Sequence, residues 1–175
     1  FKQWKKLKDY ANSTGIKIIG DIPIYVALDS ADCWSNTELF QFDQDKRLTA
    51  VAGCPPDGFS PGGQDWVNPL YRWEYHKETE FSWWINRIAH CFVLYDVLRV
   101  DHFRGFDQYF SIPYGDSTAV NGEWLDGPGY DIFKAVKEKL GDAPIIAEDL
   151  GFLTPSVEEL LTQTAYPGMK VLQFA

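Results

Sequence analysis

Two short apolar runs that each lead to a carboxylate constrain the fold of this chain more than any other feature. One run continues from a helix end through residues 93–100 to Asp101, and the other covers residues 144–147 and ends at Glu148. An apolar run of this length, followed at once by charged residues and glycine, is typical of a buried strand that reaches the surface. We therefore expect both carboxylates at the C-terminal edge of one parallel sheet.

Helical and strand patterns alternate along most of the chain. Apolar residues at helical spacing predict helices near residues 1–11, 81–92 and 133–140, and Thr154 with Pro155 favours the start of another. Strands are predicted at residues 17–21, before Asp101, before Glu148 and at residues 168–174. Residues 29–75 have little periodicity and are rich in glycine, proline and aromatic residues, which predicts a long functional loop.

This alternation predicts an α/β fold with a parallel sheet and right-handed crossovers. Four strands with polar residues at their C-terminal ends fit part of a TIM (β/α)8 barrel, with about four βα units and long active-site loop insertions. An open, doubly wound sheet is the alternative, although no glycine-rich phosphate motif supports a nucleotide site. The chain opens inside a helix and closes on an apolar run. We expect residues 1–175 to be a fragment of the barrel domain, truncated at both ends.

The amino-acid composition and charge limit the classes of binding partner that the chain can have. The chain has 25 acidic and 16 basic residues, a formal net charge of -9, which disfavours nucleic acid and anionic membranes. One basic cluster on the first predicted helix is interpreted as a solvated face; it comprises Lys2, Lys5, Lys6 and Lys8. Three cysteines, without a signal peptide or a membrane-length apolar run, indicate a cytoplasmic protein. The three histidines lack metal-ligand spacing, so no metal site is expected.

Asp101 and Glu148 are the candidate catalytic pair. Asp101 lies between Arg99 and Arg104, whose positive charge favours the ionised carboxylate of a nucleophile. Glu148 follows apolar residues, and partial burial favours a general acid/base. Two such carboxylates in one cleft suit retaining glycoside chemistry. The alternatives are a structural pairing of Asp101 with the arginines and an ion pair of Glu148 at the rim of the sheet.

Further polar and aromatic residues are candidates for substrate contacts. Asp21 ends the first predicted strand and is expected to hydrogen-bond sugar hydroxyls, or else to stabilise the turn before Pro23. His102 follows the candidate nucleophile and is suited to contact a neighbouring hydroxyl. An aromatic surface flanked by amides forms a candidate substrate lip, made of Phe59, Gln64, Trp66 and Asn68. Each of these aromatic residues could instead serve packing alone.

Six segments point to one family when they are taken in order along nearly the whole chain. They are GDIPIYV (residues 20–26), DSADCW (29–34), AGCPPD (52–57), RVDHFRG (99–105), IAEDLG (146–151) and PGMKVLQF (167–174). These segments resemble the 4-α-glucanotransferases of glycoside hydrolase family 77, also called amylomaltases or disproportionating enzymes. The resemblance implies a TIM barrel that transfers α-1,4-glucan segments to the 4-hydroxyl of an acceptor by a retaining double displacement, without a cofactor.

The resemblance also implies roles for single residues. Asp101 matches the nucleophile and Glu148 the acid/base, while Arg99, His102 and Asp21 match residues that contact the reacting sugar. The loop that guides the acceptor matches residues 55–64, among them Asp57, Phe59 and Gln64, together with Trp66 and Asn68. The expected partners are maltooligosaccharides or other α-1,4-glucans such as starch and glycogen.

Some residues depart from the family pattern. Val67 stands where the family usually has glycine, and Pro61-Gly62 where Thr-Gly is commoner, so the loop geometry is expected to differ. The family's third carboxylate lies on a later strand, and residues 1–175 alone are therefore expected to be inactive. An α-glucan hydrolase with the same carboxylates and a non-catalytic glucan-binding fragment are the alternative functions.

Overall fold

The computed structural model describes residues 1–151 and 153–174. The chain divides into two compact units, and it passes from one to the other more than once. Unit 1 comprises Phe1–Ile24, Phe81–Arg104 and Tyr130–Ala175, and unit 2 comprises Tyr25–Glu80 and Gly105–Gly129. None of the described helices is long and apolar enough to cross a membrane.

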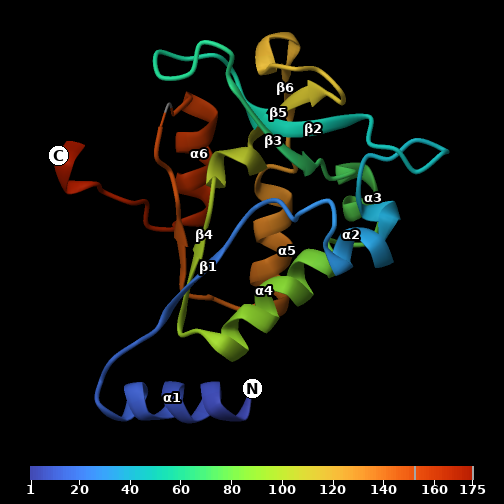
Figure 1. The fold of residues 1–175 in the computed structure, drawn as a ribbon. Coiled ribbons are helices and arrows are strands. Elements are labelled where there is room, and N and C mark those ends of the chain that lie inside the picture. The colour runs from blue at the N-terminus through green and yellow to red at the C-terminus, as the bar shows by residue number, and fades with distance from the viewer. Residues whose placement is uncertain (152, 175) are drawn as a thin grey trace. The chain divides into compact units, whose positions relative to one another are not determined.

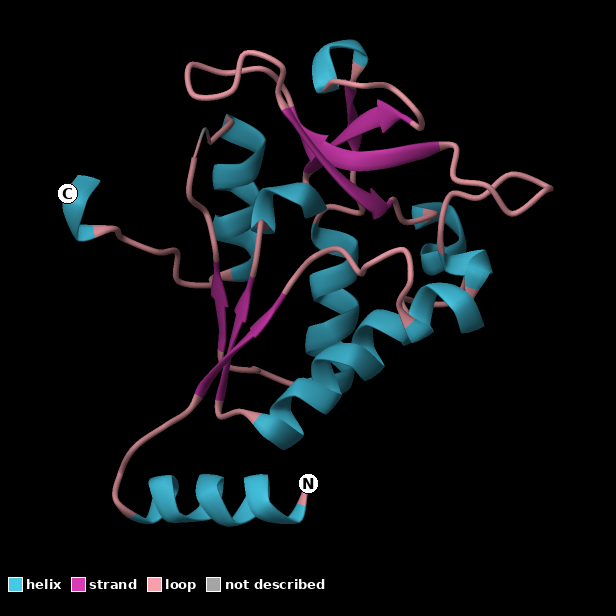
Figure 2. Cartoon of the chain, in the orientation of Figure 1, coloured by secondary structure: helices cyan, strands magenta, loops and turns pink. Residues whose placement is uncertain are grey.

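Unit 1 is built on a parallel sheet of the strands β1, β4 and β7, in that order (Figures 1 and 2). These strands span Ile19–Ile22, Val97–Val100 and Ile145–Ala147. Their registers align Ile22 with Val100 and Val100 with Ala147. Because the strands are parallel and in register, their C-terminal ends meet at one edge of the sheet.

The α-helices in the described part of unit 1 are α1 (Lys2–Ser13), α4 (Ser82–Leu94), α5 (Tyr130–Leu140) and α6 (Pro155–Thr164). Helix α4 contacts β1 and β4, and α5 contacts both α4 and α6. The hydroxyl of Thr154 accepts a hydrogen bond from the Val157 amide and caps α6, with Pro155 in its first turn, as predicted. The buried side chains of unit 1 include Leu98, Val100, Ile132, Phe133, Ile145 and Val157.

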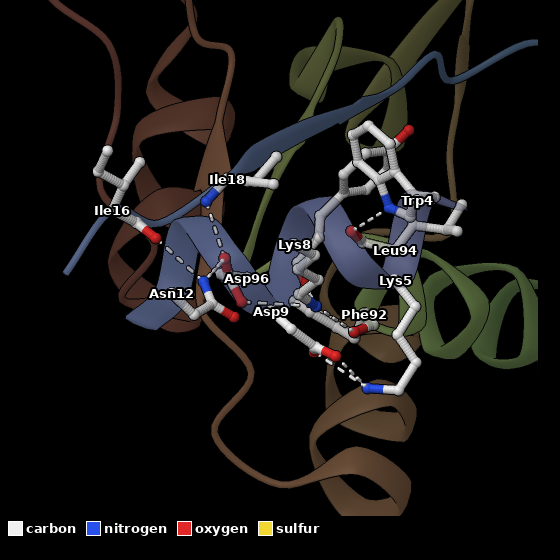
Figure 3. A network of polar contacts seen from close by, with 11 residues as sticks. Trp4, Lys5, Lys8, Asp9, Asn12, Ile16, Ile18, Phe92, Leu94 and Asp96 are labelled. Carbon is white, nitrogen blue, oxygen red and sulfur yellow. Dashed lines mark hydrogen bonds and ion pairs between the residues drawn. The ribbon is translucent and has the colours of Figure 1, made fainter. Parts of the chain in front are cut away.

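Polar contacts attach α1, which has no buried residue, to the end of α4 (Figure 3). Trp4 Nε1 donates to the Leu94 carbonyl at 2.9 Å, and Lys8 Nζ donates to the Tyr95 carbonyl at 2.8 Å. These side chains satisfy carbonyls that lack a partner within α4. Lys8 also lies 3.4 Å from Asp96, and its side chain is only 16% exposed. The interpretation of this basic cluster as a solvated face is therefore wrong for Lys8.

Asp96 is the centre of this network (Figure 3). Its Oδ2 accepts hydrogen bonds of 2.8 Å from the Ile18 amide and from the Asn12 side chain. The bond from the Ile18 backbone, followed by that from Asn12, lowers the pKa of Asp96, and the charge of Lys8 acts in the same direction. Asp96 thereby connects α1 to the chain that enters β1.

Unit 2 contains an antiparallel sheet in the order β3-β2-β5-β6. The strands span Ala50–Cys54 (β2), Gln64–Pro69 (β3), Gln108–Pro113 (β5) and Glu123–Asp126 (β6). Two short helices, α2 (Ala31–Ser35) and α3 (Trp73–Glu78), belong to the same unit. Its apolar core comprises Leu48, Val51, Phe110, Ile112 and Ala119, with Phe42 packed against it.

The structure confirms the parallel α/β sheet and corrects two details of the predicted fold. The prediction of one long loop over residues 29–75 is wrong, because β2 and β3 lie there and β2 pairs with the distant strand β5. The predicted strand at residues 168–174 is also wrong, since Leu172–Phe174 form a 3₁₀ turn. Among the described residues, three parallel strands therefore stand in place of the four expected.

Candidate active site

The C-terminal edge of the parallel sheet brings together side chains from three strands. Asp21 lies on β1, Asp101 follows β4 directly, and Glu148 follows β7 directly. The Asp101 amide donates to the Ile22 carbonyl at 3.0 Å, and the Glu148 amide donates to the Val100 carbonyl at 2.9 Å. These backbone bonds extend the strand pairing by one residue, so both carboxylates leave the sheet at the same level.

Arg99 connects two of the three acidic residues. It alternates along β4 with the buried Leu98 and Val100, and it is the register partner of Asp21 on β1. Its Nη1 lies 2.5 Å from Asp21 Oδ1, and its Nη2 lies 3.0 Å from Asp101 Oδ1. One guanidinium thus joins the candidate nucleophile to the neighbouring strand, as its planar fork allows.

The neighbouring carboxylates favour the charged form of the Arg99 guanidinium. Partial burial disfavours the charged guanidinium, but the hydrogen bond and negative charge of Asp21 outweigh it and raise the pKa of Arg99, with Asp101 and Glu148 contributing. The side chains of Asp21 and Asp101 are 56% and 40% exposed, so both can meet a ligand. The guanidinium thus lies between two carboxylates that are open to a ligand.

Main-chain amides hold the Glu148 carboxylate from two sides. Its Oε2 accepts from the His102 amide at 2.8 Å, and its Oε1 accepts from the Leu150 amide at 3.0 Å. His102 has φ 48°, in the left-handed region that few residues other than glycine adopt. The residue next to Asp101 therefore reaches Glu148 through an unusual backbone conformation.

The His102 side chain is neutral at neutral pH. Burial lowers the pKa of His102 to about 4, the positive charge of Arg104 acts in the same direction, and Asp101 opposes both. A neutral imidazole has one nitrogen that donates and one that accepts a hydrogen bond. Neutral His102 can therefore both donate and accept a hydrogen bond, and its contact with a sugar hydroxyl stays a prediction.

The remaining predicted site residues belong to unit 2. Asp57 Oδ1 accepts from the amides of Phe59 and Ser60 at 2.8 and 2.7 Å, which makes Asp57 part of a turn. That turn leaves the Phe59 side chain fully exposed. Gln64 Oε1 accepts from Trp66 Nε1 at 3.0 Å, which orients the half-buried indole.

Asn68 and Val67 lie at the end of the same strand, β3. Asn68 Nδ2 donates to the Val26 carbonyl at 2.9 Å. Val67 lies between Trp66 and Asn68 with φ 58°, and its amide donates to Asp65 Oδ1 at 2.8 Å. A β-branched residue in this region is strained, so the departure at Val67 noted in the sequence coincides with an unusual backbone.

The sequence interpretation missed Met169 and gave Asp149 no role in the site. Met169 Sδ accepts a hydrogen bond from Arg99 Nε at 3.2 Å, and the Met169 amide donates to Asp149 Oδ1 at 2.7 Å. One signal was visible, because Met169 is the single methionine of the chain and lies directly after Gly168. No group of three or more metal-ligating side chains occurs in the described part of the chain.

Fold and site together define an α/β protein that carries acidic side chains at the C-terminal edge of a parallel sheet. The sequence profile described as 4-alpha-glucanotransferase matches residues 1–175. The chain therefore belongs to the 4-α-glucanotransferase family, glycoside hydrolase family 77, and the resemblance noted in its sequence is confirmed.

Individual relatives agree with this assignment. The 4-alpha-glucanotransferase of Streptococcus pneumoniae serotype 4 is 56% identical over 175 residues, which are all of this chain and 35% of the relative. The Thermus thermophilus enzyme of the same name is 50% identical over the same length. The solved amylomaltase of Streptococcus agalactiae, in complex with acarbose, superposes with a TM-score of 0.96 at 53% identity. It covers 99% of this chain and 35% of its own, so the chain spans about a third of such relatives.

Proposed function

We propose that this chain supplies the nucleophile and the acid/base of a 4-α-glucanotransferase that acts on maltooligosaccharides and other α-1,4-glucans. The observation that carries the proposal is the pair of contacts at the sheet edge. Arg99 holds Asp101, and the amide of the next residue, His102, holds Glu148. A mechanism that uses two carboxylates requires both side chains to be held in position around the same glycosidic bond of the substrate.

In the first half of the reaction, Asp101 attacks the anomeric carbon and Glu148 protonates the oxygen of the leaving glucan. The bond between that carbon and the oxygen breaks, and a covalent glycosyl ester forms on Asp101. Each Glu148 oxygen accepts one amide hydrogen, which leaves a lone pair that can carry the transferred proton. Neutral His102 contacts a hydroxyl of the same sugar.

In the second half, the 4-hydroxyl of an acceptor glucan attacks the same carbon. Glu148 takes the proton of that hydroxyl, and Asp101 leaves as a carboxylate, which restores the starting charges. Two inversions give net retention. Residues 55–64, with Trp66 and Asn68, would receive the acceptor, and the exposed ring of Phe59 is suited to the apolar face of a sugar.

We infer that the three parallel strands are part of a (β/α)8 barrel. Family membership, the parallel register of β1, β4 and β7, and the gathering of polar residues at their C-terminal ends support this inference. The structural likeness to the Streptococcus agalactiae amylomaltase supports it as well.

Azide rescue tests the two roles separately in the whole protein, with α-maltosyl fluoride as donor. Asp101→Gly removes the nucleophile, so azide should attack the anomeric carbon of the donor directly, displace its fluoride with inversion and give the β-glycosyl azide. Glu148→Ala retains the nucleophile, so azide should attack the covalent intermediate and give the α-glycosyl azide. NMR of the isolated azides assigns the anomer.

Asp142→Asn is the matched control, because Asp142 is an 88% exposed carboxylate that forms an ion pair with the surface residue Lys137. This variant should transfer glucan at the wild-type rate without azide. The same anomer from both active-site variants, or no rescue of either, contradicts the assigned roles. Glucose released in large excess over transfer products would favour the α-glucan hydrolase instead.

A further inference from the structure

Asp149 lies next to the proposed acid/base but serves a different part of the site. Its Oδ1 accepts the Met169 amide at 2.7 Å. A Cβ atom on Gly168 would lie only 2.2 Å from Asp149 Oδ2, so the carboxyl packs directly against the backbone of this glycine. The segment is also tied to β7, because the Ala147 amide donates to the Pro167 carbonyl at 2.9 Å.

Met169 contacts the arginine that holds the proposed nucleophile. Arg99 Nε donates to Met169 Sδ at 3.2 Å, while Nη1 and Nη2 contact Asp21 and Asp101. Three donors that point in three directions fix both the position and the plane of the guanidinium. A thioether is a weak, uncharged acceptor, so it orients Arg99 without competing for the charge shared with the two carboxylates.

We propose that Asp149 and Met169 are positioning residues that act in series: Asp149 seats Met169, and Met169 orients Arg99 toward Asp101. This inference rests on the proposed function, because it assigns Asp101 the nucleophilic role. The position of the proposed nucleophile then depends on a series of contacts that begins at Asp149, next to the acid/base. The series runs from Asp149 to Met169, from Met169 to Arg99 and from Arg99 to Asp101. Removal of the Asp149 acceptor leaves the Met169 amide without its partner and frees the sulfur from Arg99.

A double-mutant cycle in the whole protein tests the series arrangement. Met169→Leu keeps an apolar side chain of similar size but removes the sulfur, and Asp149→Ala removes the acceptor. Each should lower kcat about 10-fold with little change in KM, within the losses that small misplacements cause. If Asp149 acts through Met169, the double variant should be no slower than Asp149→Ala alone.

Asp149→Asn is the conservative variant, because its amide oxygen can still accept the Met169 hydrogen. It should restore most of the kcat that Asp149→Ala loses. Losses of kcat that multiply in the double variant, or an Asp149→Asn variant as slow as Asp149→Ala, would overturn the inference. Thermal unfolding of each variant identifies one that has merely lost its fold.

A measurement independent of turnover separates this inference from the proposed function. In protein labelled with [methyl-¹³C]methionine, the Met169 methyl signal is assigned by its absence in Met169→Leu. It should shift in Asp149→Ala and in Arg99→Lys, and it should stay near its wild-type position in Asp149→Asn. A signal unmoved by Asp149→Ala defeats the inference even if azide rescue supports both carboxylates. If the signal shifts while azide rescue fails, the proposed function is at fault instead.

Discussion

The His102 amide donates a hydrogen bond of 2.8 Å to Oε2 of Glu148, so the residue after the proposed nucleophile holds the proposed acid/base. The contact needs the left-handed backbone of His102, at φ 48°. Such a conformation persists only where the surrounding structure enforces it, and it occurs often at functional sites. The distance between the two carboxylates is therefore governed by the backbone turn that follows β4.

The His102 amide contacts Glu148, whereas its imidazole is proposed to contact the substrate, and one substitution can separate these two roles. His102→Asn introduces a residue that tolerates positive φ, so the amide contact with Glu148 should persist while the imidazole is lost. We expect kcat/KM to fall about 10-fold or more, the effect of losing one hydrogen bond to the substrate, with an unchanged melting temperature. His90→Asn, on the exposed face of α4, is the control and should keep full activity. An equal loss in both variants would contradict a role for the imidazole.

The buried His76 of unit 2 predicts a pH dependence of stability. Burial lowers the pKa of His76 to about 4, the charge of Arg72 acts in the same direction, and the hydrogen bond to the Leu39 carbonyl opposes both. The folded state thus binds its proton at lower pH than the unfolded state does. The contribution of neutral His76 to the free energy of unfolding is therefore fully present above about pH 6.5. The free energy of unfolding falls by up to about 3 kcal/mol as the pH approaches 4.

Urea unfolding across this pH range, compared between wild type and His76→Gln, measures the effect. Glutamine does not titrate, so the variant should lose less stability on acidification than the wild type. A titration of the His76 ring signals by NMR checks the midpoint directly. A midpoint near the unperturbed value of about 6.5 would contradict the prediction.

The strained backbone at Val67 predicts a stabilising substitution. Val67→Gly removes a β-branched side chain that is 52% exposed and has φ 58°, so it should raise the free energy of unfolding by about 1 kcal/mol. Val120→Gly is the control, because Val120 is 60% exposed and has no positive φ. It should be neutral or destabilising. Chemical denaturation of both variants measures the free energy of unfolding. Stabilisation of both variants would mean that relief of backbone strain at Val67 is not the cause of the gain.

The contacts of Lys8 predict how α1 is held. Lys8→Met keeps the aliphatic stem but removes the donor to the Tyr95 carbonyl and the ion pair with Asp96. Hydrogen exchange of residues 2–13 should become faster by several fold, because α1 has no buried residue and is attached through polar contacts, of which Lys8 supplies two. Lys5→Met removes only an exposed ion pair with Asp9 and should leave the exchange unchanged. Equal protection in both variants would show that Lys8 does not hold α1.

The sequence predicted local features well where the signal is local. The strands before Asp101 and Glu148, the helix near residues 133–140 and the helix start at Thr154 depend on residues within one or two turns. It failed on β2 and β3, because their pairing depends on partners far along the chain, in strands without a regular alternation. The cytoplasmic location stays a prediction.

Within the candidate site, the sequence predicted residue types but not their contacts. Acidic residues after apolar runs identified Asp21, Asp101 and Glu148, and charge proximity identified Arg99. The contact between Arg99 and Met169 joins residues 70 positions apart and involves a weak acceptor, so the single methionine of the chain could be noticed in the sequence but its partner could not. The amide contact from His102 depends on a backbone angle that histidine rarely adopts.

The alignment of Asp21 with Arg99 also bears on how the chain folds. Side chains alternate along β1, so a shift of β1 by one residue against β4 would point Asp21 into the core and Ile22 toward solvent. It would also separate Asp21 from its cation and leave a buried carboxylate without a partner, at a cost of several kcal/mol. The ion pair between Asp21 and Arg99 thus favours the native register of β1 against β4 over a shifted one.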